Sequence, residues 1–139
     1  MTDDMLSWTR QQIEARKALA ESASPSPWSA NAEHDEVLAE DGERVADGFA
    51  LSGNQLRNTV DHIVFNDPRQ IIADCEADLG ILDDHEPGWA GLKRDVRVCM
   101  ACDAERGDRW PCRTVRRIAA GYQYRPGYRP EWAPERMTS

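Results

Sequence analysis

Three of the four cysteines of the chain lie close together in the sequence, in a spacing typical of metal sites. Cys99 and Cys102 form a C-x-x-C pair, and Cys112 follows with nine residues between. A C-x-x-C turn supplies two thiolates from one short loop, and zinc takes four soft or borderline ligands at tetrahedral angles. A histidine stands at the end of the preceding predicted helix. The spacing therefore predicts a zinc site formed by His85, Cys99, Cys102 and Cys112.

The identity of the fourth ligand is not settled by the spacing alone. His62, His34 and Cys75 are the alternatives to His85, although Cys75 falls in the apolar stripe of a predicted helix, where a cysteine is typically a small buried hydrophobe. Disulfides, an iron–sulfur cluster held by all four cysteines, and thiols without metal are the other interpretations. Four protein ligands leave no position for a substrate or an activated water, so the predicted zinc is structural.

No catalytic arrangement of residues is recognisable. The three histidines are scattered, and the sequence contains neither a phosphate-binding glycine loop nor a nucleophile elbow. A basic face is predicted on the last helix, opposite its apolar stripe, and it consists of Arg113, Arg116 and Arg117. A zinc-supported arginine face could contact phosphates, so a nucleic-acid-binding protein is the second interpretation of function. A zinc hydrolase, with water in one ligand position, is the third.

The net charge of −8 over 139 residues is distributed unevenly. Residues 1–92 contain 6 basic and 19 acidic side chains, whereas residues 93–139 contain 11 basic and 6 acidic ones. An acidic part of this kind keeps a small protein soluble or recruits a charged partner. The favoured function is therefore a non-enzymatic protein-interaction module with its acidic N-terminal surface as the contact.

Neither a membrane span nor a secretory signal is expected. The chain has no run of about eighteen apolar residues, and no positively charged start leads into an apolar stretch. A cytoplasmic protein without membrane contact is the resulting expectation.

Two predicted helices lead to the metal site. Ser52 to Gln55 has the capping-box pattern and predicts a helix over 53–65. Asp67 and Pro68 provide the cap and first position of a second helix over 68–85, which carries Leu82 and His85 on one side. The joint between them is one or two residues, so residues 53–86 are expected to form a helical hairpin.

The N-terminal part is predicted to contain a helix over about 3–22, within a segment 1–24, and a β-hairpin over 36–48. Asp41-Gly42 favours a two-residue turn, which pairs Leu38 with Val45, Val37 with Ala46 and Glu40 with Glu43. Two strands alone are marginal, so a third strand is expected, with residues 94–98 as the candidate.

The C-terminal part is predicted to hold an irregular cysteine-rich loop over 87–111 and a final helix from Pro111 to Tyr122. Residues 123–139 are expected to form an extended tail that lies across the core, because aromatic residues alternate with prolines there. Together these elements predict a single α+β domain over 1–139, stapled by zinc, with three or four helices and a small antiparallel sheet.

The order of these short motifs is similar to that of a family of small proteins from actinobacteria and their phages, which is catalogued as a domain of unknown function. The resemblance covers nearly the whole chain, including Asn-Asp-Pro-Arg, Ile-Leu-Asp-Asp-His-Glu-Pro, C-x-x-C, Trp-Pro-Cys-Arg-Thr-Val-Arg and Pro-Gly-Tyr-Arg-Pro-Glu-Trp. It implies that His85, Cys99, Cys102 and Cys112 are the recurrent residues, and that Cys75 is peculiar to this chain. It also implies an accessory protein of a phage or prophage, and it brings no activity that can be carried over to this chain. The expected partner is a host or phage protein.

Overall fold

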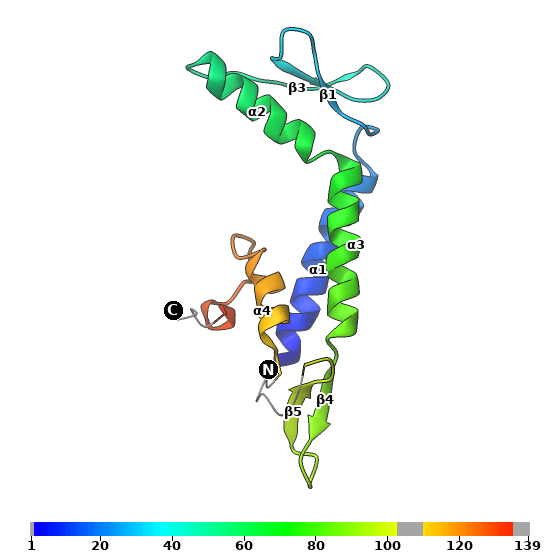
Figure 1. The fold of residues 1–139 in the computed structure, drawn as a ribbon, viewed down its shortest axis with the longest axis vertical. Helices are drawn as coiled ribbons and strands as arrows, with labels where there is room; N and C mark the ends of the chain where they lie inside the picture. Colours follow the sequence, from blue (N-terminus) through cyan, green and yellow to red (C-terminus); the bar gives the residue numbers. More distant parts are fainter. Residues whose placement is uncertain (1, 103–109, 135–139) are drawn as a thin grey trace. The chain divides into compact units, whose positions relative to one another are not determined.

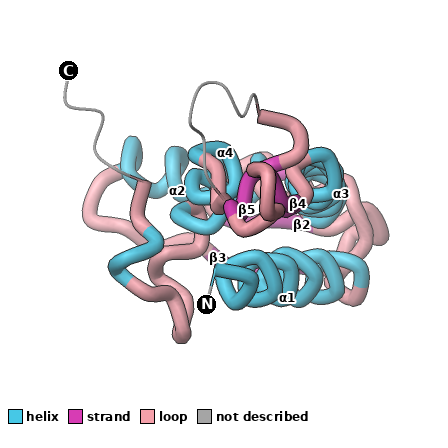
Figure 2. Tube along the Cα trace, turned by 90° about the horizontal axis from the view of Figure 1, so that it is seen from below, coloured by secondary structure: helices cyan, strands magenta, loops and turns pink. Residues whose placement is uncertain are grey.

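The computed structural model describes residues 2–102 and 110–134 of the chain. These residues belong to two compact units: unit 1 comprises residues 1–14 and 76–139, and unit 2 comprises residues 15–75. The described residues form four α-helices and two small antiparallel sheets, which confirms the predicted α+β class but adds a second sheet (Figures 1 and 2). That the chain is one domain stays a prediction.

The three predicted N-terminal helices are confirmed to within one residue at each end. They are α1 (Thr2–Glu21), α2 (Gly53–Phe65) and α3 (Pro68–Asp84), and α1 and α3 each contribute residues to both units. The Ser52 hydroxyl caps α2 by accepting a hydrogen bond from the Gln55 N–H at 3.1 Å, as the capping-box pattern predicts. The last helix, α4 (Arg113–Ala120), is shorter than the predicted span from Pro111 to Tyr122.

Unit 2 contains a three-stranded sheet in the order β1 (Ser29–Ala30), β2 (Glu36–Leu38) and β3 (Arg44–Asp47). The predicted hairpin is confirmed, and so is the pairing of Val37 with Ala46. The third strand is β1, which pairs antiparallel with β2, and not the predicted segment 94–98. The segment before β2 therefore completes the sheet with a short strand that carries no strong β signal of its own.

The predicted pairing of Leu38 with Val45 is wrong, because the turn is longer than expected. The Ala39 N–H donates to the Glu43 carbonyl at 2.9 Å, which leaves three loop residues that end on Gly42 at φ +84°. A three-residue hairpin loop with glycine in the left-handed region is a common alternative to the two-residue turn. Leu38 consequently pairs with Arg44, a register shift follows, and Glu40 does not oppose Glu43.

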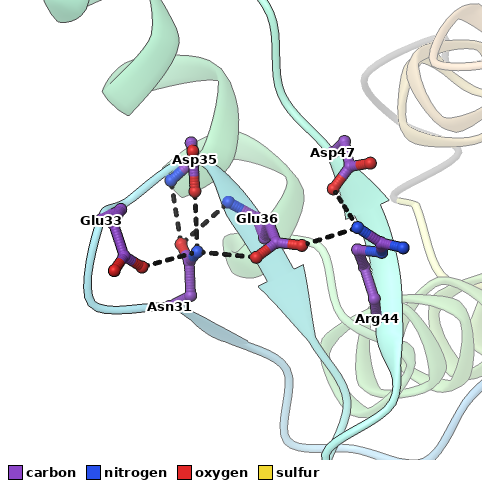
Figure 3. Close-up of polar contacts among 6 residues, drawn as sticks. All are labelled: Asn31, Glu33, Asp35, Glu36, Arg44 and Asp47. Carbon is purple, nitrogen blue, oxygen red and sulfur yellow. Dashed lines mark hydrogen bonds and ion pairs between the residues drawn. The ribbon is translucent and has the colours of Figure 1, made fainter.

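The connection between β1 and β2 is organised by the Asn31 side chain (Figure 3). Its Oδ1 accepts hydrogen bonds from the N–H groups of Asp35 and Glu36, both at 2.9 Å. Its Nδ2 donates to the Asp35 carboxylate at 2.7 Å and to the Glu36 carboxylate at 2.9 Å. Because both ends of the amide are used, Asn31 holds the loop closed and brings β2 back alongside β1.

Unit 1 contains a two-stranded sheet in the segment that was expected to be irregular. Strand β4 (Pro87–Ala90) lies antiparallel beside β5 (Val96–Cys99) (Figure 2). In this pair Pro87 is opposite Cys99, and Trp89 is opposite Arg97. The turn between the strands contains Gly91 at φ +93° and Arg94 at φ +50°. The predicted loop over 87–111 is therefore wrong in its first half, while residues 103–109 lie outside the described residues.

The tail is folded into turns and is not extended as predicted. It includes a 3-10 helix, η2 (Pro130–Trp132), whose tryptophan is buried in unit 1. Trp132 packs against Trp8 of α1 with ring centroids 5.4 Å apart, and Tyr128 lies 5.8 Å from each of these two rings. The Trp8 indole N–H also donates to the Pro126 carbonyl at 3.2 Å. Aromatic packing thus joins the tail to α1, which lies near the N-terminus of the chain.

Within unit 2, the start of α3 is held by one buried carboxylate. Asp67 is only 3% exposed, and its Oδ1 accepts a hydrogen bond from the Gln70 N–H at 3.1 Å, as the predicted cap requires. Its Oδ2 accepts a second hydrogen bond from the Trp28 N–H at 3.2 Å. The same residue therefore caps the helix and fixes the segment after the first proline-rich turn.

We expect Asp67→Ala to lower the free energy of unfolding by about 2–4 kcal/mol, because a helix cap and a second N–H partner are lost together. Asp67→Asn keeps one acceptor oxygen, so it should lose about half as much. Urea denaturation of the three proteins followed by circular dichroism measures both values. Equal stability of Asp67→Ala and the unmodified chain would show that the two hydrogen bonds contribute nothing.

Candidate metal centre

The four residues predicted to hold a metal lie together in unit 1. The Nδ1 atom of His85 is 3.4 Å from the Cys99 sulfur, 3.5 Å from the Cys112 sulfur and 3.6 Å from the Cys102 sulfur. All four of these atoms lie within 4.8 Å of one another. The structure therefore brings together the predicted set as one group that could hold a metal ion.

The hairpin β4–β5 explains why His85 and Cys99 meet. His85 follows the last turn of α3, where its N–H donates to the carbonyls of Ile81 and Leu82 at 3.1 and 3.2 Å. Strand β4 begins two residues later, and its antiparallel partner β5 ends on Cys99. The Met100 N–H donates to the Glu86 carbonyl at 2.8 Å and extends the ladder by one further bond. The hairpin thus returns the C-x-x-C loop to the end of α3.

Cys112 reaches the group from the start of α4. It is the N-cap residue in an extended conformation, at φ −71° and ψ 166°. The predicted helix from Pro111 would have placed it inside the first helical turn, which is wrong. The Trp110 N–H donates to the Arg97 carbonyl at 3.1 Å, which places the approach to α4 beside β5. The site is therefore assembled from the end of one helix, the end of a strand with its following loop, and the cap of another helix.

The electrostatic environment favours the neutral thiols of Cys102 and Cys112 in the absence of a cation. Burial, followed by the neighbouring Cys99 and Cys112, raises the pKa of Cys102 to about 12. Burial also raises the pKa of Cys112, as does the adjacent Cys99. Three thiolates in so small a volume repel one another, and a divalent cation at their centre is what would make them stable. The donor set thus fits a metal ion in its charge as well as in its chemistry.

Hydrogen bonding alone does not account for the geometry around His85. Neutral imidazole offers one donor or one acceptor at each ring nitrogen, so Nδ1 can form one hydrogen bond. Three sulfur atoms nevertheless lie at nearly the same distance from it, between 3.4 and 3.6 Å. Such an arrangement is typical of ligand atoms that share one central ion.

The alternative ligands are not part of this group. Cys75 is fully buried in α3 and behaves as the predicted buried hydrophobe. His34 instead lies beside Asp61, with Nε2 and Oδ1 2.7 Å apart, and His62 is exposed on α2. All four cysteines belong to the described residues, and none of them forms a disulfide. Because Cys75 lies outside the group, the structure does not bring together the four cysteines that the iron–sulfur alternative requires.

The three arginines of the predicted basic face do not all face solvent. Arg113 and Arg117 are exposed on α4. Arg116 is half-buried and donates from Nε to the Pro111 carbonyl at 3.1 Å and from a terminal nitrogen to the Glu131 carbonyl at 3.5 Å. It therefore joins the start of α4 to the tail, and a nucleic-acid contact through this face stays a prediction.

The fold and the site define a small α+β protein with one histidine and three cysteines placed to hold a metal ion. The chain belongs to DUF6221, a family of unknown function, whose match covers residues 2–134. The match confirms that the chain belongs to a family of unknown function, while the origin in actinobacteria and their phages stays a prediction. Neither the curated proteins nor the solved structures give a match. No helix in residues 2–102 or 110–134 is both long and apolar enough to cross a membrane.

Proposed function

We propose that His85, Cys99, Cys102 and Cys112 bind one structural zinc ion. The observation that carries this proposal is the set of three distances from the His85 Nδ1 atom to the sulfurs, 3.4, 3.5 and 3.6 Å. Zinc–sulfur bonds of about 2.3 Å and zinc–nitrogen bonds of about 2.0 Å at tetrahedral angles separate the nitrogen from each sulfur by roughly 3.5 Å. The donor atoms are therefore already spaced for a single tetrahedral ion.

The ligand set favours zinc over other metals and a structural role over a catalytic one. Three thiolates and one imidazole are a common structural zinc set, whereas calcium, magnesium and manganese prefer oxygen ligands. Ligand atoms that all lie within 4.8 Å of one another fit one ion better than a cluster, in which the ligands bind different iron atoms. With four protein ligands no position remains for water, which argues against a zinc hydrolase.

We further propose that the zinc-stapled chain is a non-enzymatic protein-interaction module of the bacterial cytoplasm. Unit 2 supports this role, because residues 15–75 contain 5 basic and 11 acidic side chains. Two large apolar residues on the loop after β3, Phe49 and Leu51, are also strongly exposed there. Exposed apolar side chains on an acidic surface suit a basic protein partner. The origin in actinobacteria or their phages, and a partner from host or phage, belong to this proposal.

Metal analysis of two matched variants tests the zinc site. Mutation of residues that only hydrogen-bond to metal ligands typically lowers metal affinity 10- to 100-fold. Because Cys102 would be a ligand itself, we expect Cys102→Ser to lower zinc affinity by at least about a hundredfold. Cys75→Ala, which also removes a thiol but lies outside the group, should keep one zinc per chain. Elemental analysis after gel filtration, with cobalt as a spectroscopic substitute for zinc, measures both variants. Full zinc content in Cys102→Ser would contradict the ligand assignment.

A further inference from the structure

The turn of the β4–β5 hairpin carries apolar and basic side chains that contribute nothing to the core of unit 1. Leu92 is fully exposed, and Trp89 is 57% exposed on the strand that leads into the turn. Lys93 and Arg94 follow Leu92 directly and are exposed as well. The turn points away from α4 and from the end of α3 (Figure 1). The structure thus presents an exposed tip with a leucine beside two cations.

The tip is held in place at its base. The ladder from Pro87 opposite Cys99 to Ala90 opposite Val96 is complete, and the Trp110 N–H bonds to the β5 carbonyl of Arg97 at 3.1 Å. The Arg97 guanidinium lies 4.8 Å from the centre of the Trp89 ring, which is a cation–π contact. Trp89 and Leu92 are therefore kept exposed by an ordered hairpin.

We propose that this tip, residues 89–97, docks on an anionic lipid surface. Leu92 would enter the boundary between headgroups and acyl chains, and Trp89 would lie at the headgroup level, where tryptophan is enriched. Residues 87–97 contain three basic side chains and one acidic one, so the tip complements anionic headgroups in charge. This contact is peripheral and needs no membrane-spanning helix, and it departs from the expectation of no membrane contact, which considered only spans and secretory signals.

Lipid suits this tip better than nucleic acid or a protein partner. A phosphate backbone would use Lys93 and Arg94 but leave Leu92 in water, and one face of the Trp89 ring already holds Arg97. A protein partner would need a preformed apolar pocket for Leu92, whereas a fluid bilayer does not. The chain has a net charge of −8, which would repel an anionic surface. Physiological salt, however, screens charges that lie more than about 8 Å from that surface. The local positive charge of the tip therefore governs the encounter.

Co-sedimentation of the full, zinc-loaded chain with vesicles tests the proposal. The expected result is binding to vesicles of equal parts phosphatidylcholine and phosphatidylglycerol, weakened by salt, and little binding to phosphatidylcholine alone. Replacing Lys93 by Gln should weaken binding about fivefold, and Leu92→Ala should weaken it by at least as much. Leu51→Ala is the matched control, because Leu51 is an equally exposed leucine of unit 2 and should leave binding unchanged.

The proposal would be overturned if the unmodified chain did not bind the anionic vesicles at low salt. It would also be overturned if Leu92→Ala and Leu51→Ala bound the vesicles equally well. The third contrary result is a chain that binds an oligothymidine but not the vesicles, and that loses the oligothymidine in Trp89→Ala. Zinc content is measured on every variant. If a variant loses vesicle binding but keeps one zinc per chain, the loss concerns the lipid contact and not the metal site.

Discussion

Removal of the proposed zinc ion with a strong chelator is expected to lower the melting temperature of the protein by roughly 10 to 20 °C. The proposed ion joins three segments of unit 1, namely the end of α3, the C-x-x-C loop after β5 and the N-cap of α4. A ligand at a thousand times its dissociation constant stabilises the folded state by about 4 kcal/mol. Thermal denaturation followed by circular dichroism, with and without chelator, measures the loss. Added zinc should restore the original value.

A ligand variant separates the metal effect from other actions of the chelator. Cys112→Ala should already melt at the lower temperature, because it removes a ligand, and chelator should not lower it further. Cys75→Ala keeps the whole group and should respond to chelator as the unmodified chain does. An equal response of Cys112→Ala and the unmodified chain to chelator would mean that the stabilising metal, if any, binds elsewhere.

The composition of the candidate site could be predicted from the sequence because each of its parts is a local signal. The C-x-x-C pair is a short loop by itself, and the apolar stripe that ends at Leu82, followed by Pro87 and Gly88, places the end of α3 near His85. Both signals depend on neighbouring residues only. What brings the parts together is the β4–β5 hairpin, and this was not predicted. Its turn contains Arg94 at φ +50°, a conformation that arginine rarely favours and that no turn motif indicates. The sequence does predict a strand over 94–98, and β5 (Val96–Cys99) lies there, but its antiparallel partner β4 is not predicted.

The errors in unit 2 arise from signals that fit more than one structure. Asp41-Gly42 indicates a tight hairpin, but the glycine serves equally in a three-residue loop, and the register then differs by one residue on one strand. The third strand, β1, is only two residues long and is positioned by the Asn31 side chain. A strand of that length carries no periodicity. Its place depends on hydrogen bonds within the folded loop, which the local sequence does not specify.

The conformation of the tail is also not specified by its local sequence, because it depends on a residue far away in the chain. Prolines and aromatic residues between 122 and 134 indicate an extended segment that lies across the core. The part of this prediction that holds is the packing of Tyr128 and Trp132 on Trp8. The turns depend on Trp8, which lies more than a hundred residues earlier and contacts both Tyr128 and Trp132. Gly127 at φ +97° lies against the same indole, so close that a β-carbon would meet it at 2.5 Å. A partner so far away in the sequence cannot be inferred from the tail alone.

We expect Trp132→Ala to lower the free energy of unfolding by about 3–5 kcal/mol, which is the usual range for removal of a buried tryptophan. Trp132 is 7% exposed and packs on both Trp8 and Tyr128, so its loss opens a cavity between α1 and the tail. Burial raises the pKa of Tyr128 in the intact protein. The substitution should therefore also lower this pKa toward its ordinary value, because the phenol gains solvent. Urea denaturation measures the stability, and absorbance of the tyrosinate measures the pKa.

Tyr124→Ala provides the matched control, since Tyr124 is an aromatic residue of the same tail that is 94% exposed. It should change stability by no more than about 0.5 kcal/mol, as surface substitutions usually do. If the tail contributes to unit 1 through the aromatic cluster, Trp132→Ala should also make residues 123–134 accessible to protease, and Tyr124→Ala should not. Equal effects of the two substitutions would show that the tail is bound by its backbone turns, and that the three rings merely lie near one another.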